Sequence, residues 1–332
     1  MTWSAKDLET IFGTAALTKT AIRAKFADVP FVGMCPKTQL ETTIFSYDIE
    51  EPDREIDSNF VATDGSSQGI QRQTYGRVSG EMPVTFKNKT MPPELLNKLR
   101  NPGTRDVRNM ETWITREVVN MKNRYGDYLD AYMIASMLTG SLTITVSGVS
   151  TSIDYGVPTS HKPTGGAWSN VATSIKGDVL TATRLVSDDT GYAARYAFVN
   201  ATTMNYLFAN TEIQNYIKET NQGQTVVEKG IITNLYGLTW VKVDQSYMSS
   251  GVATRFLAND KIIFTPEWSD EWIEMLVGRI AVLNDNGEET MADGLTAWSR
   301  PSEDPVGRKL YMKYARIPAL KVPKCVVYMT VT

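Results

Sequence analysis

Residues 102–140 read PGTRDVRNMETWITREVVNMKNRYGDYLDAYMIASMLTG, and this stretch decides how the chain folds. Pro102 and Gly103 interrupt any preceding element, and Thr104 or Asp106 can cap the start of a helix. Apolar or aromatic residues then recur every three or four positions, which places them on one helix face. They are Val107, Met110, Ile114, Val118, Met121, Tyr125, Tyr128 and Tyr132. The pattern predicts an amphipathic helix on the order of 50 Å long if it is unbroken.

The opposite face of this helix is polar and would meet solvent or a partner. It carries Asn109, Thr112, Arg116, Asn120, Asn123 and Asp127. Gly126 has a low helix propensity and allows a bend in the middle. Because the helix is far longer than the three turns usual in globular domains, it needs a broad surface to lie across.

The composition fits a soluble globular chain. Of the 332 residues, 42% are hydrophobic and 21% are charged, which is enough for a sizeable core. The sequence contains no run of about 18 apolar residues, so it predicts no membrane-spanning helix. Its first residues lack the basic start and apolar run of a usual secretion signal. The net charge of -3 argues against nucleic-acid binding by bulk charge. Cys35 and Cys325 fit no metal spacing, so both are predicted to be buried, reduced thiols.

Residues 1–40 are predicted to form an arm with little core of its own. Ala5 to Phe12 is a short helix candidate, and a polar stretch rich in alanine and threonine follows it. Pro30, Gly33 and Pro36 prevent a helix from continuing to the end of this segment. Such an arm would be ordered mainly by the surfaces that it contacts.

Residues 41–95 predict a long β-hairpin. Thr42 to Ile49 has a strand pattern, residues 63–69 are turn-forming, and the chain returns through Thr74 to Phe86. Pro83 in the returning arm fits an edge strand better than a central one. Because an isolated hairpin is marginally stable at best in water, the two arms need a neighbouring surface.

The outward arm of this hairpin is acidic, and the returning arm carries basic and apolar side chains. We therefore predict that the hairpin contacts further copies of the chain. The predicted intersubunit residues are Asp48, Glu50, Glu51, Asp53, Arg54, Glu55, Asp57, Arg72, Arg77, Val78, Met82, Val84, Phe86, Lys87 and Lys89. The acidic residues lack the spacing of a calcium-binding loop, so a solvated charged arm is preferred over a cation site.

After the helix, Leu142 to Val146 and Ser152 to Gly156 predict a strand pair, and a linker rich in proline and glycine follows. From Trp168 onward, helices and strands alternate, which indicates an α/β lobe of roughly 120 residues. The expected helices are 178–186 and 202–217. The expected strands are 195–199, 238–243, 255–264, 273–283, 310–314 and 326–331, with the last two separated by Pro318 and Pro323.

Motifs for catalysis and cofactor binding are missing from the sequence. His161 is the single histidine, and its place in the linker predicts a solvent-exposed side chain. No phosphate-binding glycine motif and no metal cluster of histidines and cysteines can be assembled. The acidic pairs Asp188-Asp189 and Glu288-Glu289 are predicted to be surface charges. Trp268 and Trp272 are predicted to anchor a core or an interface rather than to stack on a ligand.

The order of elements is an arm, a long hairpin, a long helix, a strand pair and an α/β lobe. Short motifs accompany this order: Ile153-Asp154-Tyr155-Gly156-Val157-Pro158, Trp168-Ser169, Gly307-Arg308-Lys309, Tyr314-Ala315-Arg316-Ile317-Pro318 and Pro323. Order and motifs together resemble the major capsid proteins of tailed bacteriophages, and among them the lambda-type major head proteins. The resemblance implies the α+β architecture called the Hong Kong ninety-seven fold.

The resemblance also implies a division of the chain. It consists of an N-terminal arm (1–40), an extended E-loop (41–95), a P domain with the long spine helix (96–165), an α/β A domain (166–290) and a C-terminal return to both domains (291–332). The implied function is self-assembly into the icosahedral head shell of the virion, without catalysis or cofactors.

The partners that the resemblance implies are further copies of the chain, in pentamers and hexamers. A separate scaffolding protein, a portal and a decoration protein are the other expected partners. The shell would assemble in the cytoplasm of the host bacterium and enclose double-stranded DNA without sequence-specific binding.

Two other classes of function stay open on the sequence alone. A tail tube or sheath subunit would be dominated by β-strands, which the helix at 102–140 argues against. An α/β enzyme would need a pocket that contains strongly perturbed titratable groups.

Overall fold

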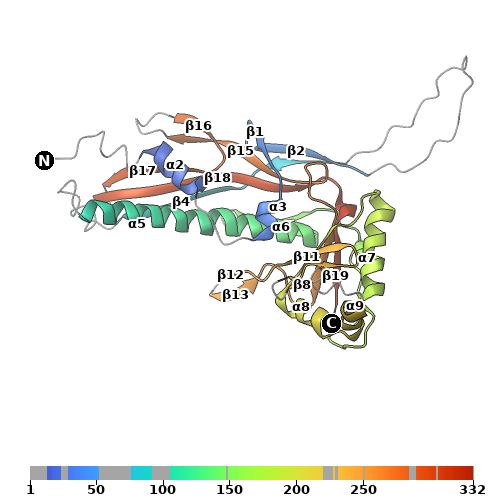
Figure 1. The fold of residues 1–332 in the computed structure, drawn as a ribbon. Helices are drawn as coiled ribbons and strands as arrows, with labels where there is room; N and C mark the ends of the chain where they lie inside the picture. Colours follow the sequence, from blue (N-terminus) through green and yellow to red (C-terminus); the bar gives the residue numbers. More distant parts are fainter. Residues whose placement is uncertain are drawn as a thin grey trace, which may run out of the picture.

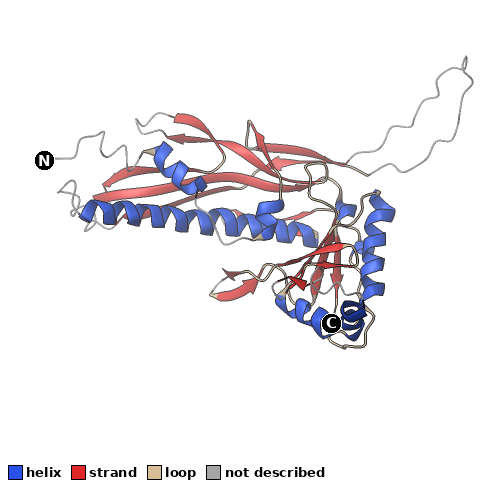
Figure 2. Cartoon of the chain, viewed as in Figure 1, coloured by secondary structure: helices blue, strands red, loops and turns tan. Residues whose placement is uncertain are grey.

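The computed structural model describes residues 13–23, 29–51, 76–91, 105–146, 149–219, 227–228, 231–249, 251–283, 289–303 and 306–331. Helices and strands are mixed and form two lobes (Figures 1 and 2). The larger lobe is an elongated sheet that lies along one very long helix, and the smaller lobe lies at one end of that helix. The α+β architecture expected from the sequence is confirmed.

The long helix runs from Arg105 to Thr139 in three joined parts. They are helix α5 (Arg105–Lys122), a π-helical turn η1 (Asn123–Asp127) and helix α6 (Tyr128–Thr139). The helix ends at Gly140, whose φ of 104° suits glycine and whose N–H donates to the Met137 carbonyl at 2.9 Å. The predicted helix is thus confirmed, and the predicted weak point, Gly126, lies inside the π turn.

In the first half of this helix the predicted apolar face is also confirmed. Ile114, Val118 and Met121 are buried against the large sheet. The side chains of Val107 and Met110 lie outside the described part of the structure. Helix α5 is therefore the amphipathic rod that the sequence pattern predicts, with one face on the sheet.

In the second half the prediction of one continuous face is wrong. Asp127, expected on the polar face, is only 9% exposed, whereas Tyr128 and Tyr132, expected inside, are half-buried. The physical reason is the π turn, in which the Tyr128 N–H donates to the Asn123 carbonyl five positions earlier. One additional residue in this turn moves the buried face along by one position.

The large sheet is built around one long central strand, β18. Its strands are β1 (Lys37–Leu40), β4 (Val84–Met91), β15 (Ile273–Leu283), β16 (Glu289–Asp293), β17 (Thr296–Glu303) and β18 (Val306–Leu320). Pro318 was expected to lie between two strands but lies inside β18, opposite Met275. Proline fits there because β4 accompanies β18 only as far as Ala315, which leaves one edge without a described partner strand.

The two faces of the large sheet are covered by different elements. On one face, α5 and helix α2 (Thr14–Arg23) pack on apolar side chains of β4, β17 and β18, with Leu17 of α2 buried. On the other face lies the hairpin of β2 (Ile44–Ile49) and β3 (Gly76–Glu81). The sheet is therefore a central layer between helices and a hairpin.

The smaller lobe contains a five-stranded mixed sheet in the order β10-β11-β7-β14-β19. The strands are β7 (Tyr196–Val199), β10 (Asn234–Leu235), β11 (Leu238–Lys242), β14 (Lys261–Thr265) and β19 (Val327–Thr330). Its helices are α7 (Ile175–Thr190), α8 (Ala201–Ala209) and α9 (Thr211–Glu219). The three helices share one apolar cluster with one face of this sheet, which confirms the predicted α/β lobe.

Two predicted elements of this lobe are divided in the structure. The helix expected at 202–217 breaks at Asn210, whose side-chain oxygen accepts from the backbone N–H groups of Glu212 and Ile213 at 3.0 and 3.3 Å. Asparagine here caps a new helix instead of continuing the old one. The strand expected at 255–264 is likewise the end of β13 (Val252–Arg255), which pairs with β12 (Ser246–Ser249), followed by the separate strand β14.

An apolar core joins the two lobes and includes part of the N-terminal segment. Phe31, on helix α3 (Pro30–Met34), is fully buried, with its ring 5.1 Å from that of Phe198 in the smaller lobe. The expectation that residues 1–40 have little core of their own is corrected for α2 and α3, because both helices bury apolar side chains. The helix candidate Ala5 to Phe12 lies outside the described residues.

The remaining described elements are short. The predicted strand pair is confirmed as β5 (Ser141–Val146) and β6 (Val149–Asp154), and β8 (Val227–Glu228) pairs with β9 (Ile231–Ile232). Both cysteines are free and buried, as expected, and burial raises the pKa of each thiol to about 12. Within the described ranges, no helix is long and apolar enough to cross a membrane.

Candidate assembly surfaces

The predicted hairpin begins with a regular ladder between β2 and β3. Asp48 lies opposite Arg77, and the Arg77 Nε donates to Asp48 Oδ1 at 2.8 Å. This hydrogen bond holds the pKa of Asp48 below its ordinary value. Both side chains stay largely exposed, at 41% and 70%, so the pair closes on itself at the surface. Val78, one position further along β3, is half-buried.

The acidic run divides between described and undescribed residues. Glu50 is exposed, and Glu51, just beyond the end of β2, forms an ion pair with Lys324 at 3.1 Å, which ties this end of the strand to the C-terminal segment. The other predicted charges lie outside the described residues: Asp53, Arg54, Glu55, Asp57 and Arg72. The charge complementarity expected between hairpin and neighbour stays a prediction for these five.

The returning arm changes partner after β3. Met82 is 2% exposed and packs inside the subunit, which corrects the expectation that it offers apolar surface to a neighbour. Beyond Pro83 the chain continues as β4, which pairs with β18 in the large sheet rather than with β2. The reason is that β18 offers β4 an eight-residue ladder and β2 already pairs with β3.

Strand β4 presents different side chains to its two sides. Lys89 forms an ion pair with Glu117 on α5, and the Lys87 ammonium lies 5.8 Å from the centre of the Tyr125 ring. Both lysines therefore have partners inside the subunit, although each keeps exposed surface. Two of the four basic residues predicted for the returning arm thus contact the long helix instead of a neighbour.

The opposite side of β4 is apolar and exposed. Val84 and Phe86 are 43% and 52% exposed. The Phe86 ring stacks on Trp298 and Tyr311, with ring centres 5.8 and 5.9 Å apart. The Lys313 ammonium also lies 5.8 Å from the centre of the Phe86 ring. A partly exposed aromatic cluster is a typical anchor for a protein contact. Of the predicted intersubunit residues that are described, these two offer the most apolar surface.

Sequence reasoning missed a further exposed apolar side chain, Ile44, which is 68% exposed on β2. Strand alternation could have found it, because Phe45 and Tyr47 point inward and Ile44 must then point outward. With Val84 and Phe86 it gives the hairpin and the edge of the large sheet an apolar surface that this subunit leaves open.

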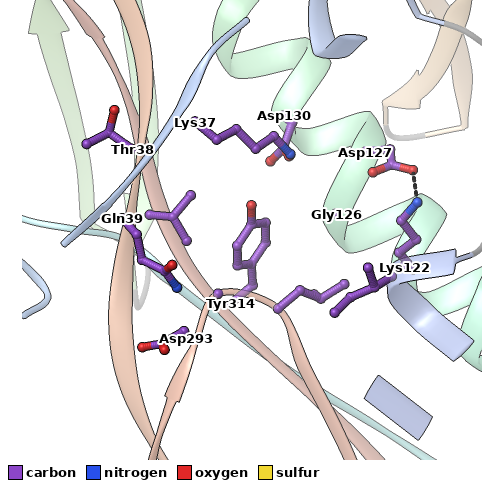
Figure 3. A pocket seen from close by; sticks show the side chains of 13 residues that line it. Lys37, Thr38, Gln39, Lys122, Gly126, Asp127, Asp130, Asp293 and Tyr314 are labelled. Carbon is purple, nitrogen blue, oxygen red and sulfur yellow. Dashed lines mark ion pairs between the residues drawn. The ribbon is translucent and has the colours of Figure 1, made fainter. Parts of the chain in front are cut away.

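Sequence reasoning also missed a charged cavity of about 350 Å³ beside the π turn (Figure 3). Lys37 and Asp130 point toward each other at 3.7 Å, and Lys122 pairs with Asp127 at 2.8 Å. Asp130 also forms a buried ion pair with Arg316 of β18. The available signal was Arg316 itself, a charge within the otherwise apolar run Tyr314-Ala315-Arg316-Ile317-Pro318.

His161 is placed differently from the prediction. It is fully buried, in the short 3₁₀ helix η2 (Thr159–His161), and its Nε2 lies 2.7 Å from Asp189 Oδ2. Its Nδ1 lies 3.1 Å from the carbonyl oxygen of Val326, so the imidazole joins the linker to α7 and to the C-terminal segment. His161 is inside because α7 and the C-terminal segment cover η2 on one side, while Thr159, Ser160 and Lys162 stay exposed. Among the described residues, no group of three or more His, Cys, Asp or Glu could hold a metal ion.

Comparison with known proteins shows to which family the chain belongs. The family model described as "Phage major capsid protein E" matches residues 33–331, which is nearly the whole chain. The chain belongs to this family. It is a capsid protein that forms the head shell of a bacteriophage.

Solved structures show the same fold at low sequence identity. A prophage capsid protein candidate from Escherichia coli CFT073 is similar at 15% identity and a TM-score of 0.62, over 96% of this chain and 99% of that one. The capsid protein of cyanophage P-SCSP1u is similar at 12% identity and a TM-score of 0.56, over 93% of this chain and 90% of that one. The protein of the mature capsid of bacteriophage PhiM1 is similar at 9% identity and a TM-score of 0.53, over 93% of this chain and 88% of that one. No curated protein sequence matches.

Membership in the capsid family gives the exposed hairpin and sheet edge a context. A shell subunit contacts copies of itself on several sides, so apolar surface left open in one subunit is expected on it. The structural role of the protein in the virion shell follows from the family.

Proposed function

We propose that the capsid protein closes an icosahedral shell of pentamers and hexamers through its hairpin and the edge strand β4. The observation that carries this proposal is the exposed apolar surface of Ile44, Val84 and Phe86, which this subunit leaves open. Contacts between exposed charges contribute roughly 0–1 kcal/mol each, so the apolar side chains would supply most of the contact energy. Repetition in every subunit makes such modest contacts sufficient.

The shell encloses double-stranded DNA, and the subunit carries no catalytic activity. The net charge of -3 supports weak contact with the genome, because tight phosphate binding needs clustered Lys and Arg. A separate scaffolding protein, a portal and a decoration protein are the further partners that we propose. Assembly takes place in the host cytoplasm.

Microscopy of the purified protein tests this proposal. Expressed alone or with its scaffold, the protein should form rings or closed shells of many subunits in negative stain. Sedimentation should show the same large particles. A stable monomer or dimer under every condition tried would contradict the proposal.

A pair of surface variants tests the role of β4. Changing Val84 and Phe86 to serine should leave the circular dichroism spectrum unchanged and prevent shell closure. Leu180→Ser is the control, because Leu180 is 40% exposed on α7, away from β4. Normal shells from the Val84/Phe86 variant would remove β4 from the assembly mechanism.

A further inference from the structure

Arg316 occupies an unusual position beside the π turn of the long helix. Its side chain is 1% exposed, and its Nε donates to Asp130 of α6. Its Nη2 donates to the carbonyl oxygens of Tyr125 and Gly126, the second at 3.3 Å, and both belong to the π turn. The guanidinium also lies 4.0 Å from the centre of the Tyr314 ring. One side chain thus binds the turn and the helix that follows it.

The contacts to the two carbonyls are the informative ones. In an α-helix these oxygens would accept from backbone N–H groups four positions later. The change to five-residue spacing at η1 disturbs this ladder, and a side chain that inserts there can satisfy the freed oxygens. Arginine suits this task because its planar fork donates in several directions at once, which an ammonium group cannot reproduce.

The π turn also lies where the helix passes from one lobe to the other. Before it, α5 packs on the large sheet through Ile114 and Val118. After it, α6 belongs to the core that joins the lobes. There the Tyr128 ring stacks on Phe256 at 6.0 Å, and Tyr132 meets Tyr247 edge-on at 5.5 Å. The register of the helix at η1 therefore sets which residues meet the smaller lobe.

We propose that Arg316 is a positioning residue for assembly, which keeps the helix in its π register and so fixes the smaller lobe relative to the large sheet. In a closed shell this relation must be the same wherever the local contacts are equivalent, because a small error in one subunit repeats around every ring. The proposal rests on the shell-forming function described above. It adds to that function the side chain that sets the geometry of the subunit.

Two variants test the proposal. Arg316→Lys keeps the charge but cannot serve Asp130 and both carbonyls together. Deletion of Asn123 removes the additional residue of the π turn and lets the helix run as α with the same buried faces. Asn123 is suited to this deletion because its side-chain oxygen is buried without a hydrogen-bond partner among the described residues. Arg316→Lys should give a folded subunit that loses closed shells of the parent diameter and forms open or irregular assemblies. Adding the deletion of Asn123 to Arg316→Lys should restore closed shells, because no π turn then has to be held in place.

The control is Ile114→Val, which weakens the packing of α5 and leaves Arg316 untouched. Thermal melting ranks the three variants by stability, and electron microscopy gives the distribution of particle diameters. Closed shells of the parent diameter from Arg316→Lys, or no recovery of such shells when the deletion is added to it, would overturn the proposal. So would equal loss of shells in the Ile114→Val control, since stability and not geometry would then be limiting.

If the variants do not fold, a measurement on the unmodified protein still tests the proposal. A high-resolution cryo-microscopy map of the parent shell should show the π turn at Asn123–Asp127 with Arg316 on its carbonyls. A regular α-helix at this place in every subunit would overturn the proposal. Failure of the parent chain to form shells would instead contradict the proposed function, so the two failures are distinguishable.

Discussion

The two halves of the long helix form one continuous backbone and have very different surroundings. Helix α5 lies on one sheet face and exposes Arg116 and Asn120 on its outer side. Helix α6 is enclosed on most sides, with Ala131, Met137 and Leu138 at 0% exposure. The first half thus has one partner surface and the second has several. The difference shows that a periodic apolar pattern predicts the buried side of a helix only where the helix packs on a single surface.

The largest difference between the halves should come from their buried charges. Asp130→Ala in α6 leaves the enclosed Arg316 without its carboxylate partner. Removing one partner of a buried pair costs about 3–5 kcal/mol, because the remaining charge stays desolvated. Urea unfolding monitored by circular dichroism measures this loss. A change below about 1 kcal/mol would show that Arg316 is solvated after all.

Cavity formation in the first half should have the next largest effect. Ile114 is 3% exposed between α5 and the sheet. Ile114→Ala should lower the free energy of unfolding by about 2–5 kcal/mol through lost burial and the cavity left behind. Asn120→Ala on the exposed side of the same helix is the matched control and should stay within about 0.5 kcal/mol. Equal effects of the two changes would show that α5 has no buried face.

Alkaline pH should destabilise the core around the second half. Burial raises the pKa of Cys35 and Cys325 from 9.0 to about 12 and raises that of Tyr314 and Tyr155. Because the folded-state values are raised, this contribution is fully present below pH 9 and is lost as the pH rises toward 12. At pH 10 each thiol should cost about 1 kcal/mol relative to neutral pH.

Melting temperatures between pH 7 and 10 measure this alkaline loss. Replacing both cysteines by alanine should make the decline with pH shallower. A melting temperature that does not fall in this range would contradict the burial of these groups.

The smallest effect is expected for the ion pair of the first half. Glu117 is nearly buried, but its partner Lys89 is 48% exposed, so water screens the pair. Glu117→Gln should change the free energy of unfolding by no more than about 1 kcal/mol. Chemical denaturation in low and high salt checks this, and a loss as large as that of Asp130→Ala would erase the distinction between the two halves.

The sequence predicted most of the fold wherever a local pattern decides the structure. The long helix, the strand pair, β7, β11 and β15 follow from periodicity and turn residues. Where a single side chain intervenes, the pattern does not show it. Asn210 divides a helix by capping its second half, and Arg316 accompanies a π turn that shifts a helix face. The Asn210 effect depends on a cap that competes with helix continuation, and the Arg316 effect depends on a contact between residues far apart in the sequence.

The candidate surface was predicted in part. Val84 and Phe86 were found from their strand pattern and are exposed. Met82 and Lys89 were assigned to the same surface, but tertiary packing gives each a partner inside the subunit. His161 was expected in solvent, because a linker rich in proline and glycine does not reveal that η2 is covered by α7. The sequence marks these residues as candidates, and only packing decides which remain exposed.

The register shift at the π turn is the central claim, and single-cysteine labelling tests it most directly. An unbroken helix puts position 132 at the centre of the buried face and position 133 beside that face, whereas one additional residue puts position 133 at the centre and position 132 beside it. Met133 is 3% exposed and Tyr132 is half-buried. The two native thiols add little background, because both are buried with pKa values of about 12. Tyr132→Cys should react with a maleimide much faster than Met133→Cys, and the reverse order would contradict the shift.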